Sequence, residues 1–480
     1  MNRRLLTLVL VVLLPLGLLF AAAQTSPDPA ATPTYANLAA PSMPFVPHLE
    51  FLTSSWFCAG VPLTDNGLGG TIAVANPGDT ALSGHLTLFT DEVGVAPVES
   101  DFEVPLRDTY KVAIGDLLPR GNYVSAMVEI AGGGGFVEQR AEQANGDSVS
   151  ACTNSTSSSW YFADNYTQGD SQEDIVITNP FPDDAIVDFT FAGTDGSRQP
   201  GVLQGVPVPG YSVLVVDEKL LAKDEAVYSL AVIASRGRVV AARAQRYSGE
   251  RHGFSMSLGA PTPSANWYFA GGIKDGTNFE RFSIYNPSDQ DAQVQPVFYG
   301  IVSDTFSNPG EITVPAGRVV SFSLVDVPDL PLGRHGIAFS SMTGAPIVVE
   351  MAVTRTDEGS SVTSVILGVE EYFADPGYFQ WSMAFGPEVA ADEVLVVLNL
   401  SFADTTVTVK VLGPGGLVAV PGLEKIALVA GAVTTVNIPA DASALGHPLI
   451  VVADQPIIVQ RLLPRGHDLK GRSASLALPG

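Results

Sequence analysis

Hydrophobic residues along this chain fall in short runs of Val, Ile, Leu and Phe that alternate with polar residues. Residues 72–77, 175–180 and 282–287 are examples, and each of these runs ends in Asn-Pro, a dipeptide that opens turns. Alternation with a period of two is typical of strands that bury one face. A helical period is not sustained over three turns, and residues 116–118 and 219–223 allow short helical turns at most. The pattern predicts an all-β fold.

Four landmarks return in the same order about every 105 residues, so the chain contains an internal repeat. An aromatic motif opens each unit, Trp-Tyr-Phe-Ala in the second and third and Trp-Phe-Cys-Ala in the first. An apolar run ending at Asn follows, then a turn that is Val-Pro in three units and Val-Ala in the fourth, and an apolar strand closes the unit. In the fourth unit, residues 372–375 carry the opening motif and the Trp follows after an apparent insertion. The tryptophans that mark the four openings are Trp56, Trp160, Trp267 and Trp381.

This repeat predicts four tandem Ig-like β-sandwiches that form an elongated rod. A unit of about 105 residues with short strands and frequent turns has the size of a two-sheet sandwich. A propeller is the alternative all-β repeat, but its blades take about 40–50 residues, so each unit would need two unlike blades. The four units are assigned to residues 51–155, 156–263, 264–370 and 371–480. Short segments join adjacent units, so we expect a semi-rigid rod.

The N-terminal segment indicates export from the cytoplasm. Residues 1–23 begin with a short basic stretch, continue with Leu and Val, and end in three Ala residues, which is a signal-peptide pattern. The apolar part is also close to the ~20 residues that span a bilayer, so an uncleaved signal anchor is the alternative. Residues 24–50 hold six prolines and predict an extended spacer. We therefore expect an extracytoplasmic protein, either secreted or held by a single N-terminal membrane anchor.

Composition narrows the range of partners. The chain carries 25 Lys and Arg against 50 Asp and Glu, for a net charge of −25. Nucleic-acid binding needs clustered Lys and Arg, so no nucleic-acid partner is expected. Hydrophobic residues make up 46% of the chain, which excludes global disorder. For an extracytoplasmic chain of this charge, envelope proteins or cell-wall glycan are the expected partners.

Two cysteines occupy matching ends of the first unit and predict a disulfide. Cys58 lies in the opening motif, and Cys152 lies at the closing strand, shortly before Trp160. The matching positions of the second unit are Phe162 and Gly259. An oxidising compartment permits such a bridge. The alternative is a metal or reactive thiol site, which no Cys-x-x-Cys and no nearby His supports.

The recurring motifs resemble a family of actinobacterial proteins of unknown function. Members carry an N-terminal signal or membrane anchor followed by tandem Ig-like repeats. The second unit is the most similar, through residues 160–164, 179–180 and 254–259, and the likeness extends over residues 56–479. The resemblance implies an envelope location and an Ig-like fold, and it implies no catalytic residue.

Candidate chemistry is sparse, and no catalytic residue is assigned. The six histidines are widely spaced, and the sequence lacks a G-x-S-x-G elbow, a phosphate loop and a dinucleotide fingerprint. Paired carboxylates such as residues 91–92, 183–184 and 392–393 fall at turns, where solvated acidic residues are common. Calcium binding at these turns is the alternative, although no D-x-D-x-D-G run supports it. No metal site and no other cofactor are expected.

The aromatic motif has two interpretations. A Trp that returns at one site of every sandwich is expected to anchor its core. The alternative is an exposed platform on which sugars stack.

The expected role is that of a non-enzymatic structural or protein-interaction protein of the cell envelope. A polysaccharide-binding surface protein is the alternative, and a secreted hydrolase with paired carboxylates in a deep pocket is the third.

Overall fold

The structure is a computed structural model, and it describes residues 43–64, 67–217, 226–302, 306–357, 359–371, 378–413, 415–439, 443–464 and 472–480. The chain divides into residues 1–40 and residues 41–480, and the fold below is that of the second unit. The predicted signal or anchor segment and most of the predicted spacer lie outside the described residues. Within the described part, no helix is both long and apolar enough to cross a bilayer. The prediction of an all-β fold is confirmed.

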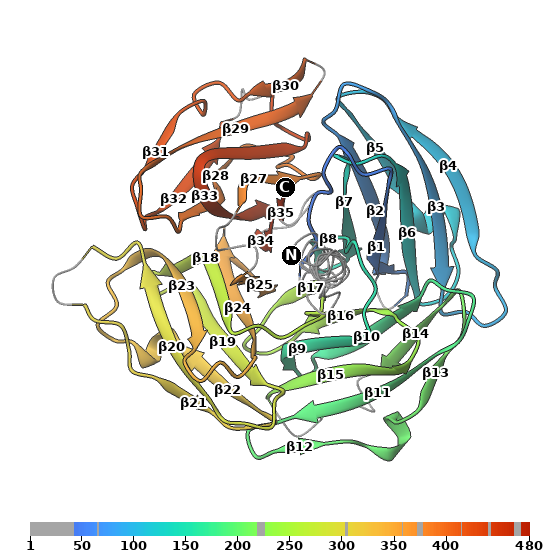
Figure 1. The fold of residues 1–480 in the computed structure, drawn as a ribbon, viewed down its shortest axis with the longest axis horizontal. Coiled ribbons are helices and arrows are strands. Elements are labelled where there is room, and N and C mark those ends of the chain that lie inside the picture. The colour runs from blue at the N-terminus through green and yellow to red at the C-terminus, as the bar shows by residue number, and fades with distance from the viewer. Residues whose placement is uncertain are drawn as a thin grey trace, which may run out of the picture. The chain divides into compact units, whose positions relative to one another are not determined.

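Four modules follow one another along the chain, and the first two are each built from two antiparallel sheets (Figure 1). The first module comprises β1 (Thr53–Pro62), β2 (Gly67–Asn76), β3 (Leu82–Thr90), β4 (Val98–Val104), β5 (Asp108–Ala113), α2 (Ile114–Leu117), β6 (Tyr123–Ala131), β7 (Phe136–Gln143) and β8 (Gly146–Ala151). The second comprises β9 (Ser159–Tyr166), β10 (Gln172–Asn179), β11 (Ala185–Ala192), β12 (Ser197–Arg198), η2 (Gly201–Leu203), β13 (Val206–Val208), β14 (Ser212–Asp217), β15 (Val227–Arg236), β16 (Val240–Tyr247) and β17 (Gly253–Leu258).

The third and fourth modules repeat this plan. The third comprises β18 (Asn266–Lys274), β19 (Phe279–Asn286), β20 (Ala292–Tyr299), β21 (Ile312–Val314), β22 (Arg318–Ser323), η4 (Leu324–Asp326), β23 (Gly333–Ser341), β24 (Val348–Asp357), β25 (Ser360–Leu367) and β26 (Val369–Glu370). The fourth comprises β27 (Tyr378–Met383), β28 (Ala391–Asn399), β29 (Thr405–Gly413), β30 (Gly416–Ala419), β31 (Ile426–Leu428), β32 (Val433–Ile438), β33 (Leu449–Pro464), β34 (Arg472–Leu476) and β35 (Leu478–Pro479). The exact residue boundaries of the four units, as assigned from the sequence, remain a prediction.

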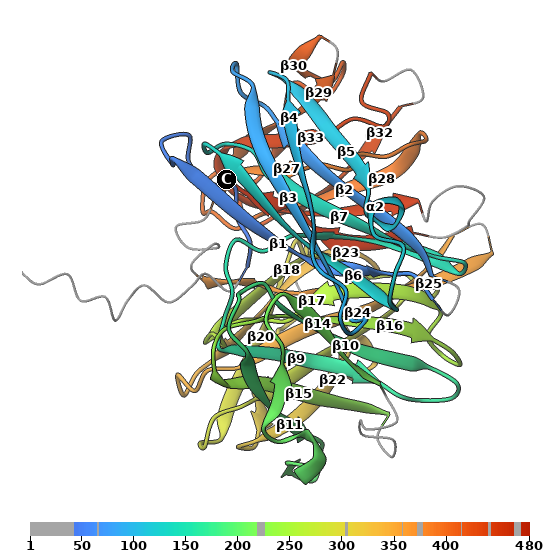
Figure 2. The ribbon, with the colours of Figure 1, turned by 90° about the vertical axis from the view of Figure 1, so that its right-hand side faces the viewer.

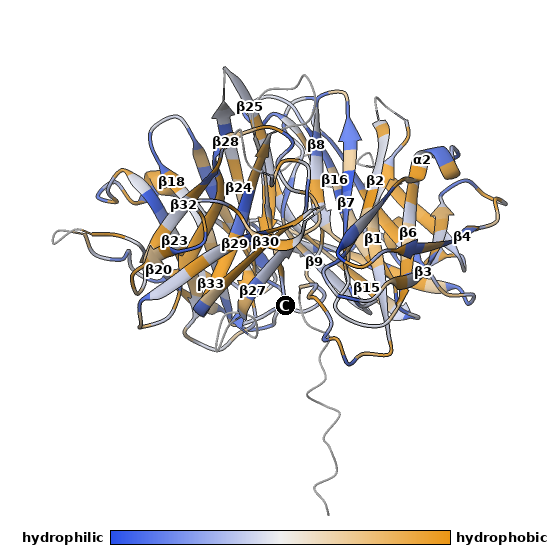
Figure 3. Cartoon of the chain, turned by 90° about the horizontal axis from the view of Figure 1, so that it is seen from above, coloured by the Kyte–Doolittle hydropathy of each residue, from blue (hydrophilic) through white to orange (hydrophobic). Residues whose placement is uncertain are grey.

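The strands of a module are divided between two antiparallel layers, which makes each module a sandwich. In the first module one sheet has the order β1-β6-β3-β4 and the other β5-β2-β7-β8. Side chains between two such sheets form the core of a sandwich. In the fourth module the long strand β33 takes part in both layers, so they join into one nine-stranded sheet. Figure 3 shows that hydrophobic residues concentrate on the strands.

The Asn that ends the second landmark holds each module's turn. Asn179 donates from Nδ2 to Asp183 O at 2.9 Å and to Val208 O at 3.0 Å. Asn286 makes the matching bonds to Gln290 O and Val314 O. The side-chain amide of this Asn thus holds the turn that follows its own strand. It also ties that turn to the strand that leads into the Val-Pro turn. This explains why Asn returns although the following Pro is lost in the fourth module.

The recurring Trp lies in the core of each module. Trp56, Trp160, Trp267 and Trp381 are at most 1% exposed. Three of the indoles donate from Nε1 to a main-chain oxygen just before or within the closing strand: Trp160 to Val239 O, Trp267 to Ile347 O and Trp381 to Ile457 O, at 2.6–2.9 Å. The equivalent bonds show that Trp381 marks the start of the fourth module, whereas residues 372–375 lie outside the described part.

The predicted disulfide between Cys58 and Cys152 is confirmed. It joins β1 to the residue that follows β8, and the second and third modules fill the same space by packing. A Cβ on Gly259 would lie 2.8 Å from the ring of Phe162, and one on Gly368 would lie 2.8 Å from the ring of Phe269. The bridge of the first module therefore corresponds to a Phe ring packed on glycine in the second and third.

Replacing Gly259 by Ala should destabilise the protein by about 1–3 kcal/mol, because the added methyl overpacks a closed core against Phe162. Thermal unfolding measures this change. Gly310→Ala is the matched control, because no atom lies within 4 Å of its added Cβ. Equal effects of the two substitutions would contradict the packing described above.

The prediction of an elongated rod is wrong, because the first and fourth modules are in contact. Glu138 of β7 and Arg461 of β33 form an ion pair at 2.7 Å with both side chains fully buried. The modules stand around a central axis, and Figure 2 shows the first and second side by side. The strand pattern specifies one module, but the rotation between modules depends on a few junction side chains that carry no periodic signal.

The four modules thus form a closed ring, and strands β8, β17, β25 and β34 lie at its axis (Figure 1). Each of these strands carries a serine at the equivalent position. Each serine accepts from, or donates to, the main chain of a neighbouring module. Ser148 Oγ accepts from Met256 N at 2.9 Å, Ser255 Oγ from Val365 N at 3.3 Å, and Ser364 Oγ from Ala474 N at 2.9 Å. Ser473 Oγ donates to Asp147 O at 2.8 Å, which completes the circuit from the fourth module to the first.

Candidate functional site

Each junction is built where the opening motif of one module meets the closing strand of the next. In the first three modules the ladder of the opening strand is irregular at the two residues after Cys58, Phe162 and Phe269. Such a bulge turns main-chain N–H groups out of the ladder. In the second module this pair is Ala163-Asp164, and its N–H groups donate to the neighbouring module, whereas Gly60 N of the first module donates to Gln139 of its own module.

At the junction between the second and third modules, the carboxylate of Glu350 accepts hydrogen bonds from these N–H groups. Its Oε2 accepts from Ala163 N at 2.8 Å and from Asp164 N at 2.7 Å. Arg243 of the second module binds the same carboxylate through both terminal nitrogens, at 3.1 and 3.2 Å. Both side chains are at most 1% exposed. A fork-to-fork pair with additional hydrogen bonds offsets the desolvation of two buried charges.

Glu138 and Arg461 repeat this arrangement at the junction that closes the ring. Glu138 Oε2 accepts from Ala384 N at 2.7 Å and from Phe385 N at 3.1 Å. Arg461 binds the carboxylate at 2.7 and 2.8 Å. The two remaining junctions have neutral residues at the Glu position, Ala242 and Gln460. A buried Glu therefore occupies this one position at alternate junctions of the ring.

A further buried carboxyl group lies in the second module. Glu173 on β10 is fully buried, and this burial raises its pKa to about 8, against the attraction of Arg243. The native state thus keeps a proton that the unfolded state releases above its ordinary pKa of about 4.3. Stability contributed by this proton is present at acidic pH and is lost as the pH rises toward 8.

Glu173→Gln should therefore raise the melting temperature at pH 8 and leave it nearly unchanged below pH 4, because a neutral amide replaces a carboxyl that burial keeps protonated. Melting curves across this pH range check the prediction. A variant that loses stability equally at both pH values would show that Glu173 is ionised in the folded protein.

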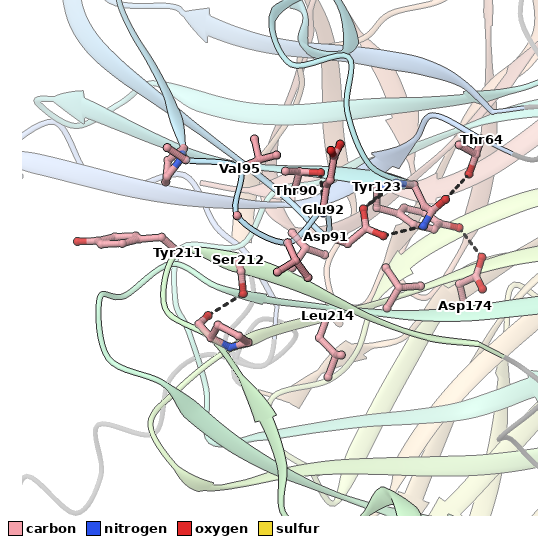
Figure 4. Close-up of a pocket in the computed structure, with 18 of the residues that line it drawn as sticks. Thr64, Thr90, Asp91, Glu92, Val95, Tyr123, Asp174, Tyr211, Ser212 and Leu214 are labelled. Carbon is pink, nitrogen blue, oxygen red and sulfur yellow. Dashed lines mark hydrogen bonds between the residues drawn. The ribbon is translucent and has the colours of Figure 1, made fainter.

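A cleft of about 1060 Å³ opens between the first and second modules (Figure 4). One wall is the loop of residues 90–97 after β3, and the other is β14 with the turn that precedes it. Tyr123 of the first module crosses the base and donates from its hydroxyl to Asp174 Oδ2 at 2.7 Å. The cleft is therefore a feature of the junction and exists only while the two modules hold their relative position.

The next two junctions are closed at the equivalent place by main-chain hydrogen bonds. Val319 N donates to Gly193 O at 3.3 Å between the second and third modules. Gly300 N donates to Gly431 O at 2.9 Å between the third and fourth. Among the described residues, no such bond joins residues 90–97 to residues 210–215. The first junction is thus open where two of its equivalents are shut.

Tyr211 stands at the mouth of the cleft in an unusual conformation. It is 43% exposed, stacks on Phe89 with ring centroids 6.3 Å apart, and has a φ of 55°. The third and fourth modules have glycine at this turn position, Gly317 and Gly431, with φ values of 66° and 68°. A bulky residue in the left-handed region is strained by about 1–2 kcal/mol, and Arg107 has the same conformation at this position of the first module, with a φ of 54°.

Carboxylates dominate the charged groups of the cleft. Asp91 accepts from Asn122 N at 2.7 Å, from Asn122 Nδ2 at 2.8 Å and from Tyr123 N at 3.0 Å. Asp174 accepts from Tyr123 and lies 3.4 Å from Arg246. These carboxylates fix the walls of the cleft and leave it with an excess of negative charge.

Most residues singled out by sequence reasoning lie elsewhere. The four tryptophans and the disulfide are core elements, and the buried indoles offer no face to a sugar. Of the paired carboxylates, residues 91–92 line the cleft. Within the described part of the chain, no group of three His, Cys, Asp or Glu side chains is arranged to hold a metal ion.

Sequence reasoning missed Tyr211, Asp174 and Arg246. A signal for Tyr211 exists, because the third and fourth units place glycine after Val-Pro-Ala or Val-Ala and the second places tyrosine. Asp174 and Arg246 are on strands whose pattern is that of ordinary half-buried positions, so no signal marks them.

Comparison with known proteins leaves the function open. Residues 134–371 match a family described as "Family of unknown function (DUF5719)". Among curated proteins, no relative matches the sequence.

Two solved structures show limited similarity. "Crystal Structure of Thermotoga maritima 1070" is 20% identical, and the match covers 23% of this chain and 96% of that chain with a TM-score of 0.19. "Crystal structure of tetra-tandem repeat in extending region of large adhesion protein" is 12% identical, and the match covers 88% and 99% of the two chains with a TM-score of 0.11.

Proposed function

We propose that this chain is a non-enzymatic interaction protein of the cell envelope, which binds a partner in the cleft between its first two modules. The observation that carries the proposal is the cleft itself, with Tyr211 exposed at its mouth, at a junction that is open where two equivalent junctions are closed by main-chain hydrogen bonds. The ring supports this role because it holds both walls of the cleft in a fixed relation.

An extracytoplasmic location is part of the proposal. The buried disulfide between Cys58 and Cys152 supports it, since such bonds persist in oxidising compartments. The signal or anchor pattern of residues 1–23 supports it from the sequence. The net charge of −25 favours cationic partners over acidic ones.

Binding is favoured over hydrolysis by the use that the chain makes of its carboxylates. Asp91 accepts three hydrogen bonds from its own module, and Asp174 is engaged by Tyr123 and Arg246. A catalytic pair needs carboxylates that face a substrate across a gap of about 5–10 Å. These two are instead committed to holding the walls of the cleft.

Capture from envelope fractions tests the proposal. The immobilised full chain is incubated with a membrane-protein extract and with isolated cell-wall glycan, each with and without calcium. We expect retention of a protein that is lost with Tyr211→Gly. Arg107→Gly is the matched control, because it replaces the residue at the same turn position of the first module, where φ is 54°. Retention that survives Tyr211→Gly would overturn the assignment of the cleft.

Polysaccharide binding is the second candidate. Tyr211 presents an exposed aromatic face at the mouth of the cleft, and the amides of Asn122 and Gln172 are among the polar groups that line it, a combination that suits a sugar. Glycan retention that Tyr211→Gly abolishes would favour this candidate over a protein partner.

A further inference from the structure

The cleft runs along the main chain of a strand edge. β14 is the edge strand of the sheet β14-β10-β16-β17. Four consecutive residues of the strand, 212–215, line the cleft. Side chains of a strand alternate between its two faces, so a cavity that touches four in a row lies beside the backbone.

The register shows which backbone groups face the cleft. Val213 pairs with Thr178 as Val319 pairs with Tyr285 in the third module. The N–H of Val319 points away from β19, because it donates to Gly193 O of the preceding module. In an antiparallel ladder the outward N–H and C=O groups belong to every second residue. Val213 and Val215 therefore direct their main-chain groups out of the sheet and toward the cleft.

From this geometry we propose that the cleft binds an extended peptide segment, which pairs with β14 as an added strand and carries basic side chains. The preceding module already supplies a main-chain partner at this place in the third module, and the first junction leaves the same place open. Strand addition supplies affinity through main-chain bonds and specificity through alternate side chains. This inference rests on the proposed function and specifies the class of partner.

The surroundings of β14 define the side chains that fit. Leu214 and Val215 are half-buried and Tyr211 is 43% exposed, so the strand edge offers apolar contacts. Asp91, Glu92 and Asp174 line the cleft together with a single cation among the described lining residues, Arg246, which lies 3.4 Å from Asp174. An extended segment that alternates aliphatic with Lys or Arg residues matches both features.

Fluorescence anisotropy with the purified full chain tests the proposal. The probe is a labelled octapeptide of alternating Val and Lys. Two further probes carry backbone N-methyl groups, one on every Val and the other on every Lys. A strand paired along one edge uses N–H groups of one parity, so one methylated peptide should bind at least tenfold more weakly and the other should keep its affinity.

Two variants and a matched control place the peptide. Val215→Pro removes an outward N–H that the β10 ladder does not use, and proline is tolerated on edge strands. It should weaken the Val-Lys peptide at least tenfold, as should Tyr211→Gly, which introduces the residue found in the third and fourth modules. Ser321→Pro makes the equivalent change in β22 and should leave binding unchanged. Melting temperatures of all three confirm folding.

Failure of this inference and failure of the proposed function are distinguishable. Equal binding of both methylated peptides, or full binding by Val215→Pro, overturns strand addition. Capture of an envelope protein that depends on Tyr211 would then still support the cleft. Binding of an N-acetylglucosamine oligosaccharide in place of the peptide, lost with Tyr211→Gly, also overturns the inference. A Val-Glu octapeptide that binds as tightly as Val-Lys contradicts the preference for basic side chains.

Discussion

Replacing Glu138 by Ala should lower the free energy of unfolding by about 3–5 kcal/mol, because the change leaves Arg461 buried and unpaired at the junction that closes the ring. It also removes the acceptor for Ala384 N and Phe385 N. Chemical denaturation measures the loss. The double variant Glu138→Leu/Arg461→Met should lose less than the single variant, because it removes both charges together.

Glu388→Gln is the control for this experiment. Glu388 pairs with Arg140 across the same junction at 2.5 Å, but its side chain is 52% exposed. An exposed pair contributes about 0–1 kcal/mol, so the control should be nearly neutral. A Glu138→Ala variant as stable as this control would show that the first and fourth modules do not meet.

Removing the disulfide should have the second large effect. Cys58 and Cys152 are separated by 94 residues, and cross-linking a loop of that length contributes up to about 4–5 kcal/mol in the chain-entropy account. Cys58→Ala/Cys152→Ala should therefore destabilise the protein by about 2–5 kcal/mol under oxidising conditions. Denaturation with and without a reductant measures this: reductant should weaken the unmodified chain and leave the variant unchanged.

The other modules provide a matched substitution. Cys58→Phe/Cys152→Gly introduces the Phe162 and Gly259 pair of the second module, which fills the space but forms no cross-link. This variant should recover the part of the lost stability that comes from packing. The part that comes from the cross-link should stay lost. A doubly substituted Ala variant as stable as the unmodified chain would contradict a stabilising role for the bridge.

Much of the fold could be predicted from the sequence, because the features of one module are local or recur at a fixed period. Alternating residues identify strands such as β10, and Asn179 identifies the turn that follows. Trp160 recurs because its indole spans the core to the main chain beside β16. The disulfide followed from the equivalence of Cys58 with Phe162 and of Cys152 with Gly259.

The ring could not be predicted in this way. Its closure depends on Glu138, Glu350, Arg243 and Arg461, which occupy only two of the four junctions and so do not recur at the repeat period. The serines on the axis recur, but a serine next to an apolar residue on a strand is ordinary. The angle between modules is encoded in such contacts between residues far apart in the sequence.

The candidate site was less predictable still. The cleft between the first and second modules is lined by the loop of residues 90–97 and by Tyr211, at a position where the third and fourth modules have glycine. The sequence reveals Tyr211 only as a departure from glycine in two later repeats. The edge of β14 faces this cleft because of how the modules are arranged in the ring, and no local sequence pattern indicates that arrangement.

A distance between the first and fourth modules tests the closed ring most directly. Spin labels at Leu106→Cys and Val418→Cys occupy exposed sites, near Arg107 and Gly416, which approach each other across the closing junction. The ring predicts one narrow distance shorter than the diameter of a module, about 35 Å. A linear array of the modules would place the labels about 100 Å apart, and a distance of that size would contradict the ring.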